Sequence, residues 1–135
     1  MEVELTKSAV IPYRFNENKL EILLVTSIRK KKWIVPKGYI EFNLTPFESA
    51  KKEAYEEAGV VGSNETVEVG QFIAEKKNRK ELIKVYTMEV DKELNDYPEK
   101  NLRKRKWFAF DEAMEKVQNP QIKNFIKKLK ETLKN

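Results

Sequence analysis

The segment from Thr45 to Gly59 constrains the fold of this chain more than any other, because it carries start and stop signals for one helix. Thr45 suits the N-cap, Pro46 suits the first helical position, and Glu48 completes a capping box. Gly59 suits the left-handed residue that ends a helix. Between these signals, small and aromatic residues recur at helical spacing and predict a buried face made of Phe47, Ala50, Ala54 and Ala58.

Strand patterns lie on both sides of this helix. Short apolar and β-branched segments predict strands at residues 8–15, 20–26, 33–35, 67–76, 82–90 and 106–110. Asp111 is predicted to cap a short helix that runs to about Val117, and Pro120 to open an amphipathic helix packed on its own domain rather than on a membrane. Mixed strands with helices predict an α+β fold, an α/β/α sandwich, as one domain over residues 1–135.

Two absences in the composition narrow the chemistry. The 135 residues contain no cysteine, which excludes disulfides, thiolate nucleophiles and Cys-ligated zinc. They contain no histidine either, which removes the commonest general base and the Ser–His and Cys–His catalytic pairs. Catalysis would therefore rest on carboxylates, lysine, tyrosine or a hard metal bound through oxygen, which points to Mg²⁺ or Mn²⁺.

Charge and hydropathy indicate the partners. No apolar run approaches the length of a membrane span, and the N-terminus lacks the layout of a secretory signal, so we expect a cytoplasmic protein without a membrane partner. The net charge is +5, and basic residues gather near residues 29–37, 76–84 and 100–106. We interpret these groups as a positive rim that attracts a small polyanionic substrate, although a solvated lysine-rich surface explains part of them.

Three glutamates lie on one stripe of the predicted helix. Glu53, Glu56 and Glu57 are spaced i, i+3 and i+4, so they fall within roughly a 100° arc beside the apolar face. Like charges at this spacing repel each other, and a hard divalent cation would remove the repulsion while gaining oxygen ligands. The alternative is an ordinary glutamate-rich surface helix.

The spacing around these glutamates resembles the Nudix box. That pattern runs Gly, five residues, Glu, seven residues, Arg-Glu, an apolar residue, any residue, Glu-Glu, any residue, Gly and an apolar residue. Gly38, expected in a loop, opens the match, and Glu53, Ala54, Glu56, Glu57, Gly59 and Val60 continue it at the required spacing. The resemblance implies a metal-dependent hydrolase whose ligands are Glu53, Glu56, Glu57 and the Gly38 carbonyl.

Two positions depart from the box. Leu44 stands where the family has Glu, and Lys52 stands where it has Arg. In the family these two residues pair and brace the loop against the helix, which Leu44 and Lys52 cannot do. We expect an apolar contact from Leu44 to replace the brace while the metal ligands remain intact.

Segments outside the box are similar to the diphosphoinositol polyphosphate phosphohydrolase branch, which also includes diadenosine polyphosphate hydrolases. The segments are Ser27-Ile28-Arg29 with Trp33-Ile34-Val35-Pro36, Asn95-Asp96-Tyr97-Pro98-Glu99, and Arg103-Lys104-Arg105-Lys106-Trp107-Phe108. The resemblance implies hydrolysis of a phosphoanhydride bond, with Glu56 or Glu99 accepting the proton. Phosphates would be bound by Arg29, Lys37, Arg103 and Arg105.

Two other functions compete with this interpretation. A Nudix fold without activity would bind a nucleotide or RNA, but such a protein has little reason to keep three glutamates. A general nucleic-acid-binding domain rests on the net charge alone, without a zinc site or a recognition-helix layout. We also read Trp33 and Trp107 as core residues rather than base-stacking platforms, and Tyr97 as either a stacking residue or a loop anchor. The sequence leaves the substrate and the oligomeric state open.

Overall fold

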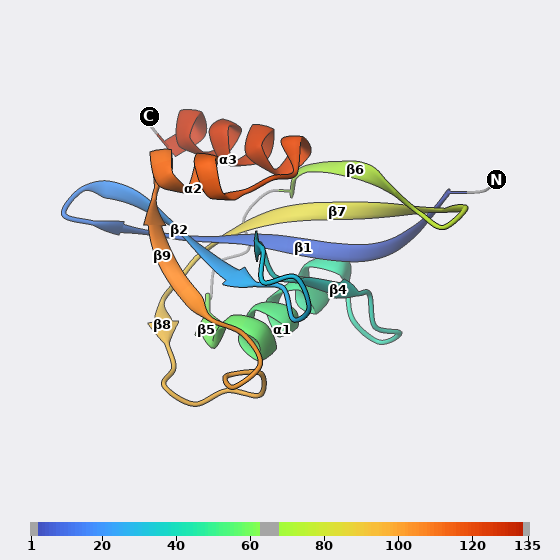
Figure 1. The fold of residues 1–135 in the computed structure, drawn as a ribbon, viewed down its shortest axis with the longest axis horizontal. Coiled ribbons are helices and arrows are strands. Elements are labelled where there is room, and N and C mark those ends of the chain that lie inside the picture. The colour runs from blue at the N-terminus through green and yellow to red at the C-terminus, as the bar shows by residue number, and fades with distance from the viewer. Residues whose placement is uncertain (1–2, 63–67, 134–135) are drawn as a thin grey trace.

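The computed structural model describes residues 3–62 and 68–133, whose helices and strands are shown in Figure 1. The strands are Val3–Asn16 (β1), Lys19–Thr26 (β2), Trp33–Ile34 (β3), Lys37–Tyr39 (β4), Val60–Val61 (β5), Glu68–Lys76 (β6), Arg79–Glu89 (β7), Lys92–Glu93 (β8) and Arg105–Ala109 (β9). The helices are Pro46–Ala58 (α1), Phe110–Lys116 (α2) and Pro120–Leu133 (α3).

One mixed sheet organises the fold. Its strand order is β3-β2-β1-β7-β6, with β4 paired to β1 and β9 paired to β2. The long strands β1 and β7 are parallel, whereas the other pairs in this sheet are antiparallel. Two tight turns with positive φ join β1 to β2, at Glu17 and Asn18, and β6 to β7, at Lys77 and Asn78. A separate small ladder pairs β5 with β8.

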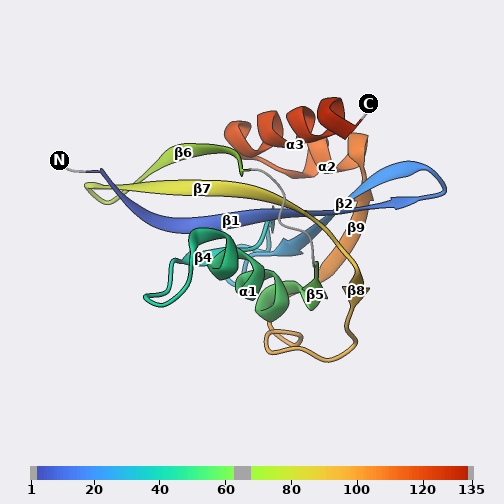
Figure 2. The same ribbon diagram turned by 180° about the vertical axis from the view of Figure 1, so that it is seen from behind.

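Helices cover both faces of the sheet, with α1 on one side and α2 and α3 on the other (Figures 1 and 2). Side chains alternate between the faces along each strand, so neighbours in β1 enter different cores. Val10 packs in the cluster that holds the apolar face of α1, whereas Ile11 packs in the cluster that holds Ile122 and Ile126 of α3. The predicted sandwich of sheet and helices is therefore confirmed.

The prediction for α1 is confirmed in detail. Thr45 caps the helix, Glu48 closes the capping box, and Gly59 ends it with φ 65°. The predicted apolar face, Phe47, Ala50, Ala54 and Ala58, is buried. The stripe of α3 also packs against the sheet, with Ile122, Ile126 and Leu129 buried.

Other predictions need correction. Asp111 does not cap α2, because the helix already begins at Phe110 and Asp111 lies in its first turn. Gly38 lies in strand β4 rather than in a loop, and the two-residue strands β5 and β8 carry too little pattern to be predicted. Of the predicted strand 67–76, Val67 lies outside the described residues. The assignment of residues 1–135 to one domain stays a prediction.

None of the three helices among the described residues is long and apolar enough to span a bilayer.

Candidate active site

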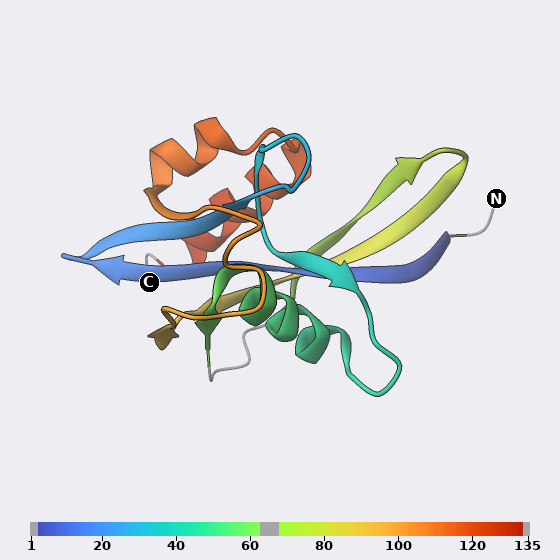
Figure 3. The same ribbon diagram turned by 60° about the horizontal axis from the view of Figure 1, so that its bottom comes forward.

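Strand β4 runs beside helix α1 (Figure 3), and Glu53 of the helix lies against Gly38 of the strand. Gly38 of β4 pairs with Ser8 of β1, so its backbone is fixed by the sheet. The Glu53 side chain lies directly against it: a Cβ at position 38 would stand 2.4 Å from Glu53 Cδ and 2.6 Å from Glu53 Oε2. A side chain at position 38 would have to displace the Glu53 carboxylate, so glycine here allows that carboxylate to approach the strand.

Glu57 is a buried carboxyl group with a perturbed pKa. Its side chain is 3% exposed, and burial raises its pKa to about 8, against the opposing effect of the Arg103 guanidinium. Burial also raises the pKa of Glu53, and the Glu53 and Glu57 side chains share a hydrogen bond. A second positive charge at this point would offset the desolvation of both groups.

Glu56 lies one step around the helix from this pair. It is half-buried, and its backbone carbonyl accepts a hydrogen bond from the Glu99 amide at 2.9 Å. Within residues 3–62 and 68–133, no three acidic side chains are already gathered around one point in the manner of a metal site. The donor set nevertheless suits Mg²⁺ or Mn²⁺, because it consists of carboxylate oxygens with a backbone carbonyl nearby.

Cations and Glu57 line one cavity of about 420 Å³. Of the four predicted phosphate-binding residues, Arg29, Lys37 and Arg103 line the cavity together with Gly38 and Glu57. Lys7 lines it as well, although no sequence pattern pointed to this residue. Its position in β1, next to Ser8, brings it there.

The two lysines of the cavity, Lys7 and Lys37, repel each other. Lys7 is 8% exposed and lies 3.1 Å from the buried Glu81 carboxylate, which also pairs with Arg79. Burial, and then the nearby charge of Lys7, lower the pKa of Lys37. An anion placed between Lys7 and Lys37 would relieve their repulsion, so this end of the cavity favours a negatively charged group.

Arg103 ties the cavity to the chain segment before β9. Its Nε donates to Glu99 Oε1 at 2.9 Å and its Nη1 donates to the Thr26 carbonyl at 3.1 Å, while Nη2 lies 3.8 Å from Glu57 Oε1. The guanidinium thus has a fixed place beside Glu57, and it still lines the cavity.

Arg105 does not lie among the residues lining that cavity. Its Nη1 donates to the carbonyls of Ala58 and Gly59 at 2.8 and 3.5 Å, and its guanidinium stacks on Tyr97 with 4.7 Å to the ring centre. A cation in this position satisfies the C-terminal carbonyls of α1 and complements the helix dipole. We therefore leave Arg105 out of the phosphate-binding set.

This placement predicts a structural effect. Replacing Arg105 with Ala should lower the free energy of unfolding by about 1–3 kcal/mol, because charged hydrogen bonds to the end of α1 are lost. Thermal unfolding would measure it, with exposed Lys104→Ala as the control. Unchanged stability together with a weaker affinity for a polyphosphate would instead return Arg105 to the phosphate-binding set.

The aromatic residues near the site have packing partners. Trp33 stands edge-on to Phe108, with ring centres 4.9 Å apart, and joins the core under α3. Trp107 packs beside the other core, and the Arg14 guanidinium covers its ring at 4.1 Å. Tyr97 is buried, which supports its reading as a loop anchor.

The sequence of this chain is similar to that of known proteins. The model of the NUDIX domain matches residues 5–129. The chain is 35% identical to diphosphoinositol polyphosphate phosphohydrolase 2 of Homo sapiens, covering 92% of this chain and 69% of the relative. It is 31% identical to Nudix hydrolase 12, mitochondrial, of Arabidopsis thaliana, covering 80% of this chain and 64% of the relative. The chain thus spans about two thirds of the length of these relatives.

Solved structures share the fold. A C. elegans Ap4A hydrolase matches with a TM-score of 0.77 at 19% identity, over 96% of this chain and 99% of that one. The NUDIX domain of Shewanella oneidensis NrtR, complexed with ADP ribose, matches with a TM-score of 0.79 at 14% identity, over 98% and 90% of the two chains. At these identities the likeness concerns the fold alone.

Proposed function

Because this chain belongs to the Nudix hydrolase family, we propose that it hydrolyses a phosphoanhydride bond in a small polyanionic substrate with Mg²⁺ or Mn²⁺. The observation that carries the proposal is that Gly38 and buried Glu57, both in contact with Glu53, line a cavity together with several cations. Carboxylates and cations that face one space suit a metal-bound polyphosphate, whose charge needs both.

The roles follow from position. Glu53, Glu56, Glu57 and the Gly38 carbonyl would hold the metal, which when bound supplies positive charge to the phosphate oxygens and makes water more acidic. Arg29, Lys37 and Arg103, together with Lys7, would hold the phosphates. Glu99 already pairs with Arg103 at 2.9 Å, which favours Glu56 as the group that accepts the proton of the attacking water.

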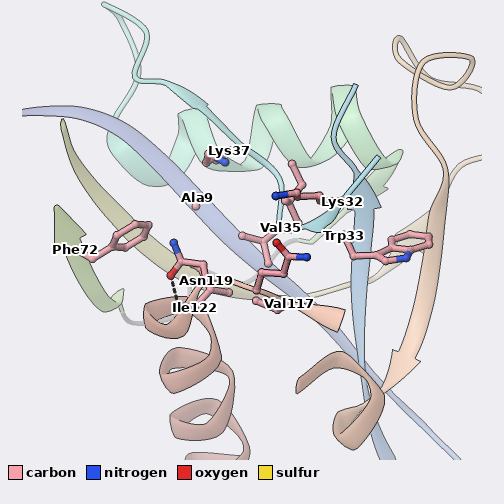
Figure 4. Close-up of a pocket in the computed structure, with 11 residues that line it drawn as sticks. Ala9, Lys32, Trp33, Val35, Lys37, Phe72, Val117, Asn119 and Ile122 are labelled. Atoms are coloured by element: carbon pink, nitrogen blue, oxygen red, sulfur yellow. Dashed lines mark hydrogen bonds between the residues drawn. The ribbon is translucent and has the colours of Figure 1, made fainter. Parts of the chain in front are cut away.

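A second, apolar pocket favours one substrate class. It has a volume of about 200 Å³, roughly that of seven water molecules in the liquid. Ile34 and Lys37 line both this pocket and the cationic cavity, so the two adjoin. Its walls include Val35, Phe72 and Ile122, and Figure 4 shows Phe72 and Trp33 at its opposite ends.

This pairing suits a polyphosphate that carries a flat, weakly polar ring system. A dinucleoside polyphosphate has such a group, whereas a diphosphoinositol polyphosphate bears phosphates around a polar ring and would leave the apolar pocket unfilled. We therefore propose dinucleoside polyphosphates as the preferred substrates.

Blocking the apolar pocket tests this preference. Exposed Gln118 lines its rim, and Gln118→Trp should raise the KM for diadenosine tetraphosphate about 10-fold while hydrolysis of a diphosphoinositol polyphosphate stays unchanged. Gln121→Trp is the matched control, because Gln121 is exposed nearby and does not line the pocket. Equal effects on both substrates would contradict the assignment, and no product from either with Mg²⁺ would favour a binding protein.

A further inference from the structure

An ion pair that the family pattern does not contain joins the loop between β4 and α1 to the helix itself. Lys52 Nζ donates to Glu41 Oε1 at 2.9 Å and to Glu41 Oε2 at 2.8 Å. Lys52 occupies the arginine position of the Nudix box, but its partner lies three residues before Leu44, where the family has its glutamate. The predicted apolar replacement is therefore wrong: Leu44 is half-buried and joins neither hydrophobic cluster among the described residues.

Further hydrogen bonds hold Glu41 over the helix. Its backbone amide donates to the hydroxyl of Ser49, which is fully buried in α1, and its carbonyl accepts from the Leu44 amide at 3.1 Å. One residue earlier, the Ile40 amide donates to the Thr6 carbonyl of β1. The side chain of Glu41 thus extends from a backbone that is tied to both the sheet and the helix.

This pair lies next to the proposed metal ligands in the sequence. Lys52 immediately precedes Glu53, and Glu41 follows Gly38 by three residues. The ion pair therefore joins the two segments that meet where Glu53 lies against Gly38, and Gly38 itself lines the cavity. Lys52 is also electrostatically linked to Glu53 and Glu56.

We propose that Glu41 and Lys52 are positioning residues. They replace the Glu–Arg brace of the family with a pair whose acidic member lies three residues earlier in the loop. This inference rests on the proposed function only for its catalytic consequence. Both side chains are about half exposed, so the pair contributes little to global stability. We expect the pair instead to fix the position of Glu53 relative to Gly38. Such positions matter, because a displacement of about 1 Å at a reacting group costs roughly 100-fold in rate.

The test measures the stability of the loop separately from catalytic activity. In metal-free Glu41→Gln, which keeps the backbone hydrogen bonds, hydrogen exchange at the amide of residue 44 should speed up relative to the intrinsic rate of that sequence. The Kd for Mg²⁺ should rise about 10-fold. With diadenosine tetraphosphate, kcat should fall about 10-fold with KM unchanged. The triple variant Glu41→Gln, Leu44→Glu, Lys52→Arg rebuilds the family pair and should restore all three values.

Glu75→Gln is the matched control, since it breaks another exposed ion pair, with Lys80, at the far hairpin. Because the exchange measurement needs neither metal nor substrate, it stands even if the protein hydrolyses nothing. Faster exchange in Glu41→Gln that the triple variant reverses supports the brace. Exchange in Glu41→Gln equal to that of the unmodified protein would overturn it.

Discussion

Replacing Glu57 with Gln is expected to reduce Mg²⁺-dependent hydrolysis of diadenosine tetraphosphate by roughly 1,000-fold. Glutamine keeps the size of the side chain but cannot become an anion, so the metal loses its most buried ligand. The fold should survive, because burial raises the pKa of Glu57 to about 8 and so favours the neutral form that glutamine resembles. Steady-state turnover and a thermal melt of the metal-free protein would measure the two effects.

The same helix supplies the control for this variant. Glu48→Gln removes a carboxylate from the first turn of α1, and glutamine can still close the capping box with Thr45. Turnover should therefore be unchanged in Glu48→Gln. Full activity in Glu57→Gln would rule out the proposed metal site, whereas an unfolded Glu57→Gln protein would mean that the carboxyl group has a structural role.

The second large effect is expected at Arg103. Replacing it with Met should lower kcat/KM by about 100-fold or more, because a buried charge partner is removed from Glu57 and Glu99 at the same time. A bound phosphate would also lose its nearest guanidinium. Arg103→Lys should recover only part of the rate, since an ammonium group cannot bind Glu99 and the Thr26 carbonyl with a planar fork.

Lys104→Met is the matched control for Arg103, because the neighbouring side chain is exposed. Its kcat/KM should match that of the unmodified protein at physiological salt. If Arg103→Met folds and turns over normally, Arg103 is neither a phosphate ligand nor a support for Glu57, and the cationic wall of the cavity must be reassigned.

Family membership and helix α1 were predictable because each rests on local signals. The cap at Thr45, the stop at Gly59 and the apolar stripe between them all act within a few residues of one another. The fixed spacing from Gly38 to Val60 identified the family, and the NUDIX match over residues 5–129 confirms it. The relative named diphosphoinositol polyphosphate phosphohydrolase supports the predicted branch.

What escaped prediction depends on contacts between distant segments. Strand β4 has three residues, too few for a periodic pattern, and it exists because it pairs with β1. Lys7 enters the cavity only through the register of β1, which no local signal reports.

Arg103 and Arg105 were both predicted from the sequence to bind phosphates, and contacts with distant segments separate them. Arg103 and Arg105 lie two positions apart, yet one lines the cavity and the other caps α1. Residues two apart in an extended segment share a face, so the difference comes from what each meets along that face: Glu99, the Thr26 carbonyl and Glu57 at Arg103, and the end of α1 at Arg105. Lys52 likewise found a partner, Glu41, outside the position that the family pattern specifies.

The corner formed by Gly38, Glu53 and Glu57 is where we propose that a divalent metal binds. Anomalous diffraction from crystals grown with Mn²⁺ would locate the ion without reference to activity. We expect a peak within about 2.0–2.6 Å of the Glu53 and Glu57 carboxylates. A peak at other residues, or none at this corner with Mn²⁺ in millimolar excess, would contradict it.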